Sequence, residues 1–282
     1  MQDLKPFERL WNGWKTVGEA GQGTNGKVYE LVNGSRHMAL KHVFIDGSDE
    51  EQLRAVQREI KILSDLSDTA AEDHVTCLYD ADEAEDENGK HFFLWFDRLI
   101  TLEEYIDKYT INLSEVIWLG LDVCRALVCL EKRGIVHRDI KGENIYSTTA
   151  RNGGFLLGDF GCVVYENEDA PNVGTPNYMA PEVLRGEKAT HLSDIYSLGM
   201  VLYKLLNGGR LPFVPANAVH EDYAAALEKR RNGEALPKPV NAGEELAAVV
   251  LKACAFDRNE RYQSAGELEI DLNRVRTLTV RS

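Results

Sequence analysis

Apolar residues recur at helical spacing in two long stretches of the chain. In residues 51–66 and 114–133 they return every three or four positions, which places them on one face of a helix. In the second stretch this apolar face consists of Val116, Leu119, Val123, Leu127 and Leu130, and it ends at Gly134. Further helices are expected at residues 102–109, 193–206, 218–231, 244–255 and 265–275. The pattern therefore predicts that the second part of the chain is mostly helical.

The first hundred residues have a different pattern, with short apolar runs that predict strands. We expect strands at residues 14–17, 38–43, 75–79 and 91–96, and a further strand directly after a glycine-rich turn. Residues 80–90 are rich in Asp and Glu and are predicted to form the solvated tip of a hairpin. One later apolar run, residues 155–157, is also predicted to be a strand. The chain should therefore begin with a β-rich part.

Large apolar residues also occur ahead of the first predicted strand. Phe7, Leu10, Trp11 and Trp14 follow one another at roughly helical spacing. We interpret this segment as a cap that packs on the β-rich part of the chain, in preference to a binding surface. No function is assigned to it.

Composition and charge exclude several classes of function. The 282 residues carry a net charge of −14, which disfavours binding to nucleic acid or to anionic lipid, because both depend on an excess of Lys and Arg. The five cysteines are an odd number without the close spacing of a zinc site, which indicates a reducing compartment. Residues 1–10 lack the apolar stretch of a signal peptide, and the longest apolar run, residues 92–96, is too short to cross a bilayer. We expect a cytoplasmic location, for the protein itself or for this part of a longer one.

The densest concentration of chemically useful side chains lies in residues 135–146. Asp139 can accept a proton from an attacking hydroxyl, Lys141 can stabilise the charge on a transferring phosphoryl group, and Asn144 can offer an amide oxygen to a hard cation. A polar surface loop at the end of a helix would explain the His-Arg-Asp triplet alone. It does not explain Asn144 at its particular distance from Asp139.

This segment resembles the catalytic loop of eukaryotic-type protein kinases, and the other motifs of that family follow in order. Gly21, Gly23 and Gly26 resemble the glycine-rich flap over the phosphates, although three spaced glycines can also simply build a hairpin. Strands on both sides of this turn favour the kinase flap over a dinucleotide-binding turn. In the kinase family, Lys41 would hold two phosphates and form an ion pair with Glu59.

The resemblance implies binding sites for ATP and Mg²⁺. Asp159 lies in Asp-Phe-Gly, twenty positions after Asp139, and together with Asn144 it would supply the metal-binding oxygens. Backbone groups near Asp97 and Leu99, in the link between the lobes, would meet the adenine, and Tyr146 would lie beneath it. The full implied set of cofactor-binding residues is Gly21, Gly23, Gly26, Val28, Ala39, Lys41, Glu59, Asp97, Leu99, Tyr146 and Asp159.

Residues 174–182 resemble the end of a protein-kinase activation segment, which forms the platform for a polypeptide substrate. Small-molecule kinases of related fold generally lack this element. The resemblance implies that Thr175 contacts Asp139 and Lys141, as in a Ser/Thr kinase. It also implies a buried ion pair between Glu182 and Arg261, and it implies that Asp194 supports the backbone of the catalytic loop.

The chain departs from the family pattern at several positions. No Ser or Thr lies between Gly161 and Thr175, so the usual phosphorylated switch has no aliphatic hydroxyl to use. We hypothesise that one carboxylate of this loop pairs with Arg138 instead, and Tyr165 remains a competing switch. The candidate carboxylates are Glu166, Glu168 and Asp169. Gly142 stands where proline is common, and Cys162 is interpreted as a packed, inert thiol.

Together these features predict one kinase domain of α+β class with two lobes. Residues 1–98 would form a small antiparallel β-rich lobe with one main helix, and residues 99–282 a larger helical lobe. The expected activity is ATP-dependent transfer of the γ-phosphate to Ser or Thr hydroxyls of protein substrates, with autophosphorylation. The sequence resembles bacterial members of the family in residues 11–14 and 211–213.

Two alternative functions remain open at this point. A catalytically silent scaffold with a kinase fold is disfavoured by the intact set of Lys41, Glu59, Asp139, Asn144 and Asp159. A small-molecule kinase is disfavoured by Lys141 and by residues 174–182. Mg²⁺-dependent nucleotide binding with autophosphorylation would exclude the first alternative, and labelling of proteins from ATP would exclude the second. The oligomeric state and the physiological substrate do not follow from the sequence.

Overall fold

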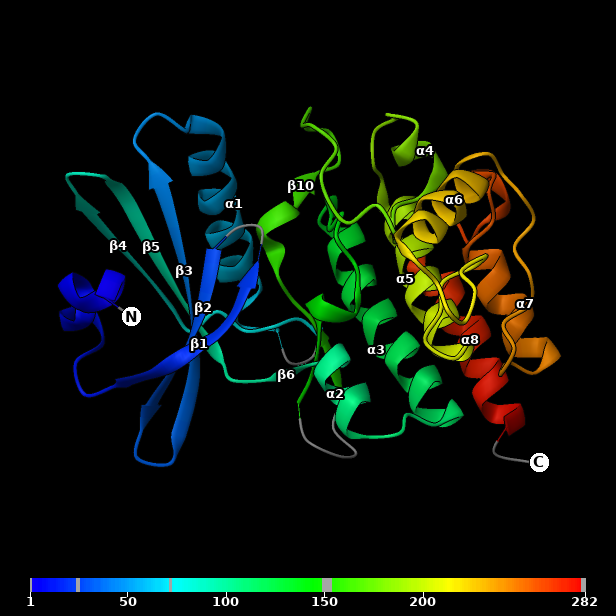
Figure 1. The fold of residues 1–282 in the computed structure, drawn as a ribbon, viewed down its shortest axis with the longest axis horizontal. Coiled ribbons are helices and arrows are strands. Elements are labelled where there is room, and N and C mark those ends of the chain that lie inside the picture. The colour runs from blue at the N-terminus through cyan, green and yellow to red at the C-terminus, as the bar shows by residue number, and fades with distance from the viewer. Residues whose placement is uncertain (1, 24–25, 71–72, 149–153, 280–282) are drawn as a thin grey trace. The chain divides into compact units, whose positions relative to one another are not determined.

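The computed structural model describes residues 2–23, 26–70, 73–148 and 154–279 (Figure 1). The chain divides into two compact units. The first unit comprises Met1–Leu99 with Asp159–Gly161, and the second comprises Ile100–Gly158 with Cys162–Ser282. The division after Leu99 lies one residue from the expected lobe boundary, but Asp159–Gly161 group with the first unit because Asp159 contacts Lys41.

The first unit contains a five-stranded antiparallel sheet with strand order β1-β2-β3-β5-β4. Its strands are β1 (Lys15–Gly23), β2 (Gly26–Asn33), β3 (Arg36–Asp46), β4 (Asp80–Asp86) and β5 (Gly89–Asp97). The central strand β3 pairs with β2 on one side and with β5 on the other. The residues that neighbour Lys41 across the sheet are therefore set by the register of these two pairings.

The acidic stretch was predicted wrongly as a hairpin tip. Most of it forms the edge strand β4 (Asp80–Asp86), whereas the strand predicted at residues 75–79 is absent: residues 76–79 have no regular secondary structure. Its charged side chains are tolerated because an edge strand is solvated: Glu83 pairs with Lys90, and Asp82 accepts a hydrogen bond from Trp95 Nε1. Charges on an edge strand also oppose pairing with other chains. The turn itself consists only of residues 87–88.

The expected cap at the start of the chain is confirmed, as a 3-10 helix, η1 (Gln2–Trp11). Leu4, Phe7 and Trp11 are buried in one apolar cluster with side chains from one face of the sheet. Those sheet residues are Tyr29, Leu31, Met38, Leu40, Phe93 and Trp95. Full burial of such large apolar side chains contributes about 1.5–3 kcal/mol each, so the cap stabilises the sheet.

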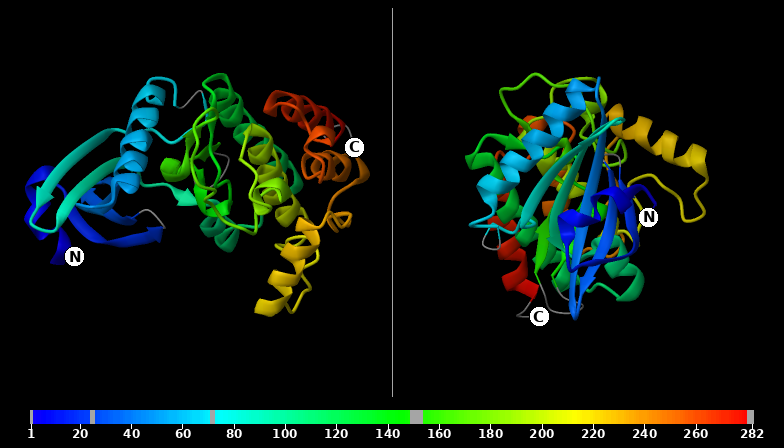
Figure 2. Two further views of the ribbon diagram at one scale, coloured as in Figure 1. Left: turned by 90° about the horizontal axis from the view of Figure 1, so that it is seen from above. Right: turned by 90° about the vertical axis from the view of Figure 1, so that its left-hand side faces the viewer.

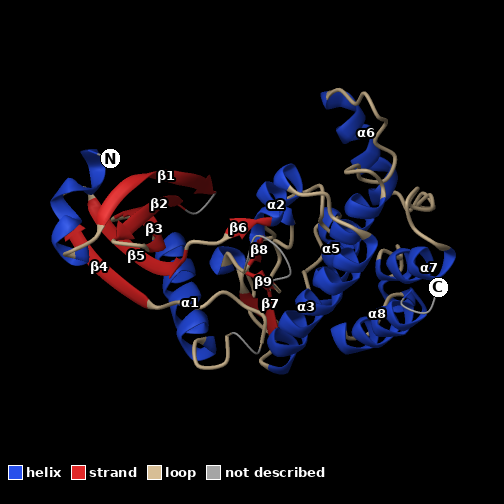
Figure 3. Cartoon of the chain, turned by 90° about the horizontal axis from the view of Figure 1, so that it is seen from below, coloured by secondary structure: helices blue, strands red, loops and turns tan. Residues whose placement is uncertain are grey.

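The main helix of the first unit is α1 (Glu50–Leu66), which begins one residue before its predicted start. The Asp49 side chain caps it by accepting a hydrogen bond from the Gln52 amide. Val56, Ile62 and Leu63 are buried, and Glu59 is buried with them. Helix α1 and the cap η1 lie on opposite sides of the sheet (Figures 1 and 3). Glu59 is thus presented to the face of the sheet that the cap does not cover.

The second unit is mostly helical, as predicted (Figure 3). Its helices are α2 (Leu102–Lys108), α3 (Leu113–Lys132), α4 (Pro181–Leu184), α5 (His191–Leu206), α6 (His220–Arg231), α7 (Glu244–Ala253) and α8 (Ala265–Thr279). Every member of the predicted apolar face of α3 is buried. Helix α6 buries only Ala226 and Arg230 and projects from the other helices of this unit in both views of Figure 2. Within the part of the chain that the structure describes, no helix has the length and apolar character needed to span a membrane.

Two small sheets of the second unit frame the catalytic loop. One has the strand order β6 (Ile100–Thr101), β8 (Ile145–Ser147) and β9 (Phe155–Leu157), and the other pairs β7 (Ile135–Val136) with β10 (Val164–Tyr165). The short 3-10 helix η2 (Gly142–Asn144) lies between β7 and β8 in the chain. The polar residues 137–144 thus lie between strand β7 and strand β8. A strand therefore holds each end of this polar segment.

Candidate active site

Lys41 has two acidic partners within the first unit. Its Nζ donates to Glu59 Oε1 at 2.7 Å, which confirms the predicted ion pair, and to Asp159 Oδ1 at 2.8 Å. Burial by itself would lower the pKa of Lys41, but the charges of Asp159 and Glu59 outweigh it and raise that pKa. Burial raises the pKa of Glu59, against the effect of the Lys41 charge. Lys41 therefore remains an ammonium ion, able to hold an anionic ligand.

The sheet register brings three of the predicted nucleotide-binding residues to one face. Lys41 lies directly opposite Val28 of β2, and Ala39 precedes it by two positions in β3. Directly opposite residues and residues two apart share a face of a sheet. This is the face toward which α1 presents Glu59. The predicted roles of Val28 and Ala39 in binding the nucleotide stay predictions.

The glycine-rich turn joins β1 to β2, with Gly23 opposite Gly26. Its tip, Thr24 and Asn25, lies outside the described residues. Gly26 has a φ of +144°, and a Cβ there would lie 2.4 Å from the carbonyl oxygen of His42 in β3, so the close pairing of β2 with β3 requires this glycine. A Cβ on Gly21 would meet nothing within 4 Å. Packing explains Gly26, whereas it does not explain Gly21.

Asp139, Lys141, Asn144 and Thr175 form one hydrogen-bonded group in the second unit. Asp139 Oδ1 accepts from the Thr175 hydroxyl at 2.8 Å, and Asp139 Oδ2 lies 2.9 Å from Lys141 Nζ. Lys141 Nζ also donates to the Thr175 hydroxyl at 3.0 Å. Asn144 Nδ2 donates to the backbone oxygen of Asp139 at 2.8 Å and to its Oδ2 at 3.1 Å. The predicted contacts of Thr175 are therefore confirmed.

Asp194 supports the backbone of the catalytic loop, as predicted. Its two carboxylate oxygens accept from the backbone amides of His137 at 2.7 Å and Arg138 at 2.9 Å. Burial raises the pKa of Asp194 to about 7, while the two amide donors act to lower it. Arg138 has a φ of +71°, a conformation that few non-glycine residues adopt. The bonds from Asp194 help to hold the loop in that conformation.

Arg138 also contacts the activation segment, but through backbone carbonyl groups. Its Nε donates to Cys162 O at 2.6 Å, and a terminal nitrogen donates to Pro171 O at 2.8 Å. Of the three carboxylates considered from the sequence, Glu166 accepts instead from His191 Nδ1 at 2.8 Å. A pair between Arg138 and a carboxylate of this segment stays a prediction.

The predicted ion pair between Glu182 and Arg261 is confirmed. Two guanidinium nitrogens of Arg261 each donate to one oxygen of Glu182 at 2.7 Å, and the side chains are 0% and 2% exposed. Burial alone would raise the pKa of Glu182, but Arg261 outweighs it and lowers that pKa. The pair ties the end of the activation segment to the loop before α8.

Asp97, Leu99 and Tyr146, which were expected to surround the adenine, each have neighbours that the structure shows. The backbone amide of Leu99 donates to the carbonyl oxygen of Asp97 at 3.0 Å, and the Asp97 side chain accepts from Tyr79 at 2.8 Å. Tyr146 lies in β8, opposite Thr101 and Leu156, and is half-buried. Their contacts with a nucleotide stay predictions.

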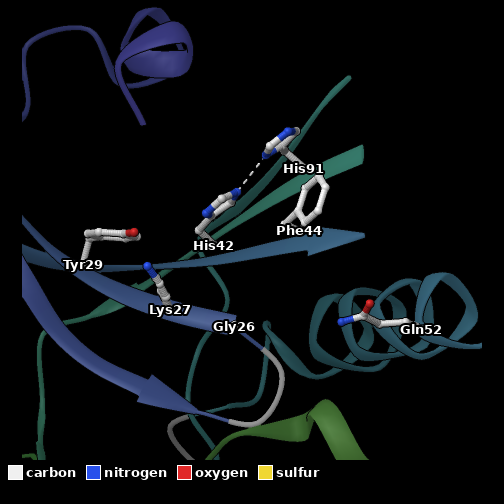
Figure 4. A pocket seen from close by; sticks show the side chains of 7 residues that line it. All are labelled: Gly26, Lys27, Tyr29, His42, Phe44, Gln52 and His91. Carbon is white, nitrogen blue, oxygen red and sulfur yellow. Dashed lines mark hydrogen bonds between the residues drawn. The ribbon is translucent and has the colours of Figure 1, made fainter. Parts of the chain in front are cut away.

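Sequence reasoning did not foresee a hollow of about 330 Å³ in the first unit (Figure 4). It is lined by Gly26, Lys27, Tyr29, His42, Phe44, Gln52 and His91. The rings of His42 and His91 are nearly parallel, and their nitrogens form a 2.9 Å hydrogen bond. Since His42 follows Lys41 in β3, the two side chains point to opposite faces of the sheet. His42 therefore lies on the face of the sheet opposite Lys41, and Gln52 of α1 completes the lining of the hollow.

The comparisons with known proteins agree with the motifs. A model of the protein kinase domain family matches residues 14–269. The chain is 32% identical over 240 residues to serine/threonine-protein kinase PknB of Mycolicibacterium smegmatis, an alignment that covers 77% of this chain and 36% of that protein. It is 31% identical over 262 residues to serine/threonine-protein kinase PknD of Mycobacterium tuberculosis, covering 89% and 38%. It is 28% identical over 273 residues to a probable serine/threonine-protein kinase PknB of Lactococcus lactis, covering 92% and 41%. The alignments thus cover less than half the length of each of these relatives.

Proposed function

The chain belongs to the protein kinase domain family, and from this premise we propose that it is an ATP-dependent protein serine/threonine kinase. The observation that carries the proposal is the group formed by Asp139, Lys141 and Thr175. In that group a threonine hydroxyl donates to the carboxylate that would accept the proton of an acceptor hydroxyl. The names of the relatives also support this activity.

In the proposed reaction, Asp139 orients the acceptor hydroxyl and takes its proton. Lys141, 2.9 Å from Asp139 Oδ2, places a positive charge where negative charge grows on the transferring phosphoryl group. Asn144 fixes Asp139 by donating to both its backbone and its side chain. Because these donors are already in position, little reorganisation is needed during transfer.

Lys41 is proposed to hold the phosphates of ATP, since the buried carboxylate of Glu59 and the partly exposed carboxylate of Asp159 keep it charged and oriented. Asn144 uses its nitrogen to bond Asp139, so its amide oxygen is available to a cation. Asp159 would supply a carboxylate oxygen. This donor chemistry suits Mg²⁺, which takes few protein ligands and, when bound, neutralises phosphate charge.

The proposed substrates are proteins with Ser or Thr, and the domain is proposed to phosphorylate itself as well. The ordered end of the activation segment supports a polypeptide platform, because Glu182 and Arg261 hold it by a buried ion pair. The five cysteines form no disulfide with one another, which fits the proposed cytoplasmic location.

Replacement of the proposed proton acceptor tests the activity. Asp139→Asn should lower phosphate transfer from labelled ATP to protein by about 10²- to 10⁴-fold, because the amide cannot accept the proton. The matched control is Asp107→Asn, which changes an exposed carboxylate in α2 and should transfer at the wild-type rate. Phosphosite mapping of the products would show which hydroxyls are used. Near-wild-type transfer by Asp139→Asn would refute the assignment, and the absence of any transfer by the wild type would favour the silent scaffold.

A further inference from the structure

The absence of a side chain at Gly142 leaves room for a side chain from another part of the second unit, that of Glu103. A Cβ at Gly142 would lie 2.1 Å from Glu103 Oε1 and 2.9 Å from Glu103 Cδ. Real Cβ atoms do not approach other heavy atoms so closely, and any residue other than glycine would displace the Glu103 carboxylate. The carboxylate of α2 therefore rests against the backbone of the catalytic loop, one residue after Lys141.

Glu103 is held in this place by a cation from a third element. Lys204 of α5 donates from Nζ to Glu103 Oε1 at 2.7 Å, and the same Nζ lies 3.4 Å from the hydroxyl of Tyr178. The side chains of Glu103 and Lys204 are partly exposed, at 31% and 22%. Burial by itself would lower the pKa of Lys204, but Tyr178 and Glu103 raise it, so the ammonium is retained.

Tyr178 connects this ion pair with the reacting group. It is buried, its carbonyl oxygen accepts from the Ser197 hydroxyl at 2.9 Å, and its amide donates to the carbonyl oxygen of Thr175 at 2.9 Å. Thr175 in turn contacts both Asp139 and Lys141. The Glu103–Lys204 pair is thus connected to the group around Asp139 in two ways. Glu103 contacts the backbone of Gly142, and Lys204 contacts Tyr178, which bonds Thr175.

We infer that Glu103 and Lys204 are positioning residues for the protein substrate. They fix the catalytic loop at Gly142 and the substrate platform at Tyr178 in one relative arrangement, without touching the reacting atoms. The inference rests on the proposed kinase function. The contacts of Glu103 and Lys204 are with Gly142 and Tyr178, and neither residue is among those proposed to bind ATP, so the pair should affect the protein substrate and leave ATP binding unchanged.

The first test separates the two substrates kinetically. Lys204→Met keeps the aliphatic stem of the side chain, and Glu103→Gln keeps the shape of the carboxylate. Each should raise the KM for a protein substrate by about fivefold or more while the KM for ATP stays within about twofold. The matched control is Lys229→Met, which breaks a surface ion pair of α6 with Glu234 and should change neither constant. An unchanged protein KM, or a parallel rise in both constants, would overturn the inference.

The second test uses the close contact itself. Gly142→Ala should displace the Glu103 carboxylate and reproduce the higher protein KM. Once Glu103→Ala has removed that carboxylate, adding Gly142→Ala should cost less than it does in the wild type, because the space is free. If the two substitutions instead multiply their effects, the contact has no positioning role. This double-variant comparison remains informative even if Gly142→Ala lowers stability.

Hydrogen exchange supplies a readout that does not need catalysis. Lys204→Met should increase exchange at the Tyr178 amide, which is bonded to Thr175, and leave exchange at the buried amides of β3 unchanged. Unchanged exchange at Tyr178 would contradict the inference even in an inactive protein. If the wild type transfers no phosphate, the proposed function fails, and the exchange result alone decides whether the pair holds the platform.

Discussion

At the residue scale, two residues of the candidate site hold backbone conformations that side chains rarely adopt. Arg138 has a φ of +71° and Asp159 a φ of +55°. Each such residue costs about 1–3 kcal/mol unless its surroundings impose the conformation. Asp194 bonds the Arg138 amide, and Lys41 bonds the Asp159 side chain. The unusual backbone conformations therefore occur at residues whose side chains need a particular orientation, and the buried partners Asp194 and Lys41 maintain these conformations.

A substitution of Gly174 would test whether the activation segment must lie close to the backbone of the catalytic loop. Its φ is +120°, and a Cβ would lie 2.4 Å from the carbonyl oxygen of Arg138. We expect Gly174→Ala to displace the segment and to lower protein phosphorylation by at least about tenfold, because Thr175 follows directly. The measurement is phosphate transfer to a protein substrate at saturating ATP.

Gly186→Ala is the matched control for this prediction. Gly186 also has a positive φ, +89°, but a Cβ there would meet nothing within 4 Å. It should lose only the stability that the left-handed conformation costs an alanine, about 1–2 kcal/mol. Equal losses of turnover in the two variants would show that backbone strain, and not the approach to Arg138, is responsible.

At the element scale, the part of the activation segment before Thr175, residues 162–174, is held without a Ser or Thr to phosphorylate. Arg138 donates to its carbonyl groups at Cys162 and Pro171, and Glu166 pairs with His191 at the first residue of α5. Burial would lower the pKa of His191, but the hydrogen bond and charge of Glu166 outweigh it and raise that pKa. The pairing of this element with α5 should therefore depend on pH.

The pairing of Glu166 with His191 should weaken as the pH rises, because the pKa of His191 is raised in the folded protein. The stabilisation is complete below about pH 6.5, the value for an unfolded histidine, and is lost as the pH rises through the higher folded value. Both side chains are partly exposed, so the effect should be about 1 kcal/mol or less. Limited proteolysis of residues 162–173 should become faster as the pH rises above about 6.5. Glu166→Gln should remove most of this change, and an identical pH profile in that variant would contradict the role of the pair.

At the scale of the whole molecule, two charged pairs of the candidate site join segments that are far apart in the sequence. Lys41 and Asp159 are 118 positions apart, and Arg261 and Glu182 are 79 apart. The first pair lies within the first unit and the second pair within the second unit. Each unit is thus closed by a charged pair whose members the chain supplies at distant points, and each pair lies next to a candidate functional segment.

Arg261→Met should strongly destabilise the second unit. It leaves Glu182 buried without its cation, and breaking a buried pair costs about 3–5 kcal/mol. Urea unfolding should show this loss. The double variant Glu182→Leu with Arg261→Met should lose less than the Arg261→Met variant, because no unpaired charge remains. A double variant that loses the sum of both single effects would contradict this explanation.

Much of the candidate site could be predicted because its residues belong to ordered motifs. The predicted pairs of Lys41 with Glu59 and of Glu182 with Arg261, and the predicted contacts of Thr175 and Asp194, are confirmed, whereas the bond between Lys41 and Asp159 was not predicted. The pattern of apolar and polar residues predicted secondary structure less well where a strand is exposed to solvent. The strand β4 (Asp80–Asp86) was missed because its charges resemble a loop, and only its place at the sheet edge makes them tolerable.

The sequence by itself determined the class of fold, the family and the chemical identity of the proposed catalytic groups, because periodicity and motif spacing are local properties of the chain. The tertiary structure decided which groups meet. It assigned Glu166 to His191, placed Glu103 against Gly142 and put a pair of histidines on the face of the sheet opposite Lys41. No spacing rule reveals such contacts, since they depend on how separate elements pack and on which side chain fills the space left by a missing Cβ.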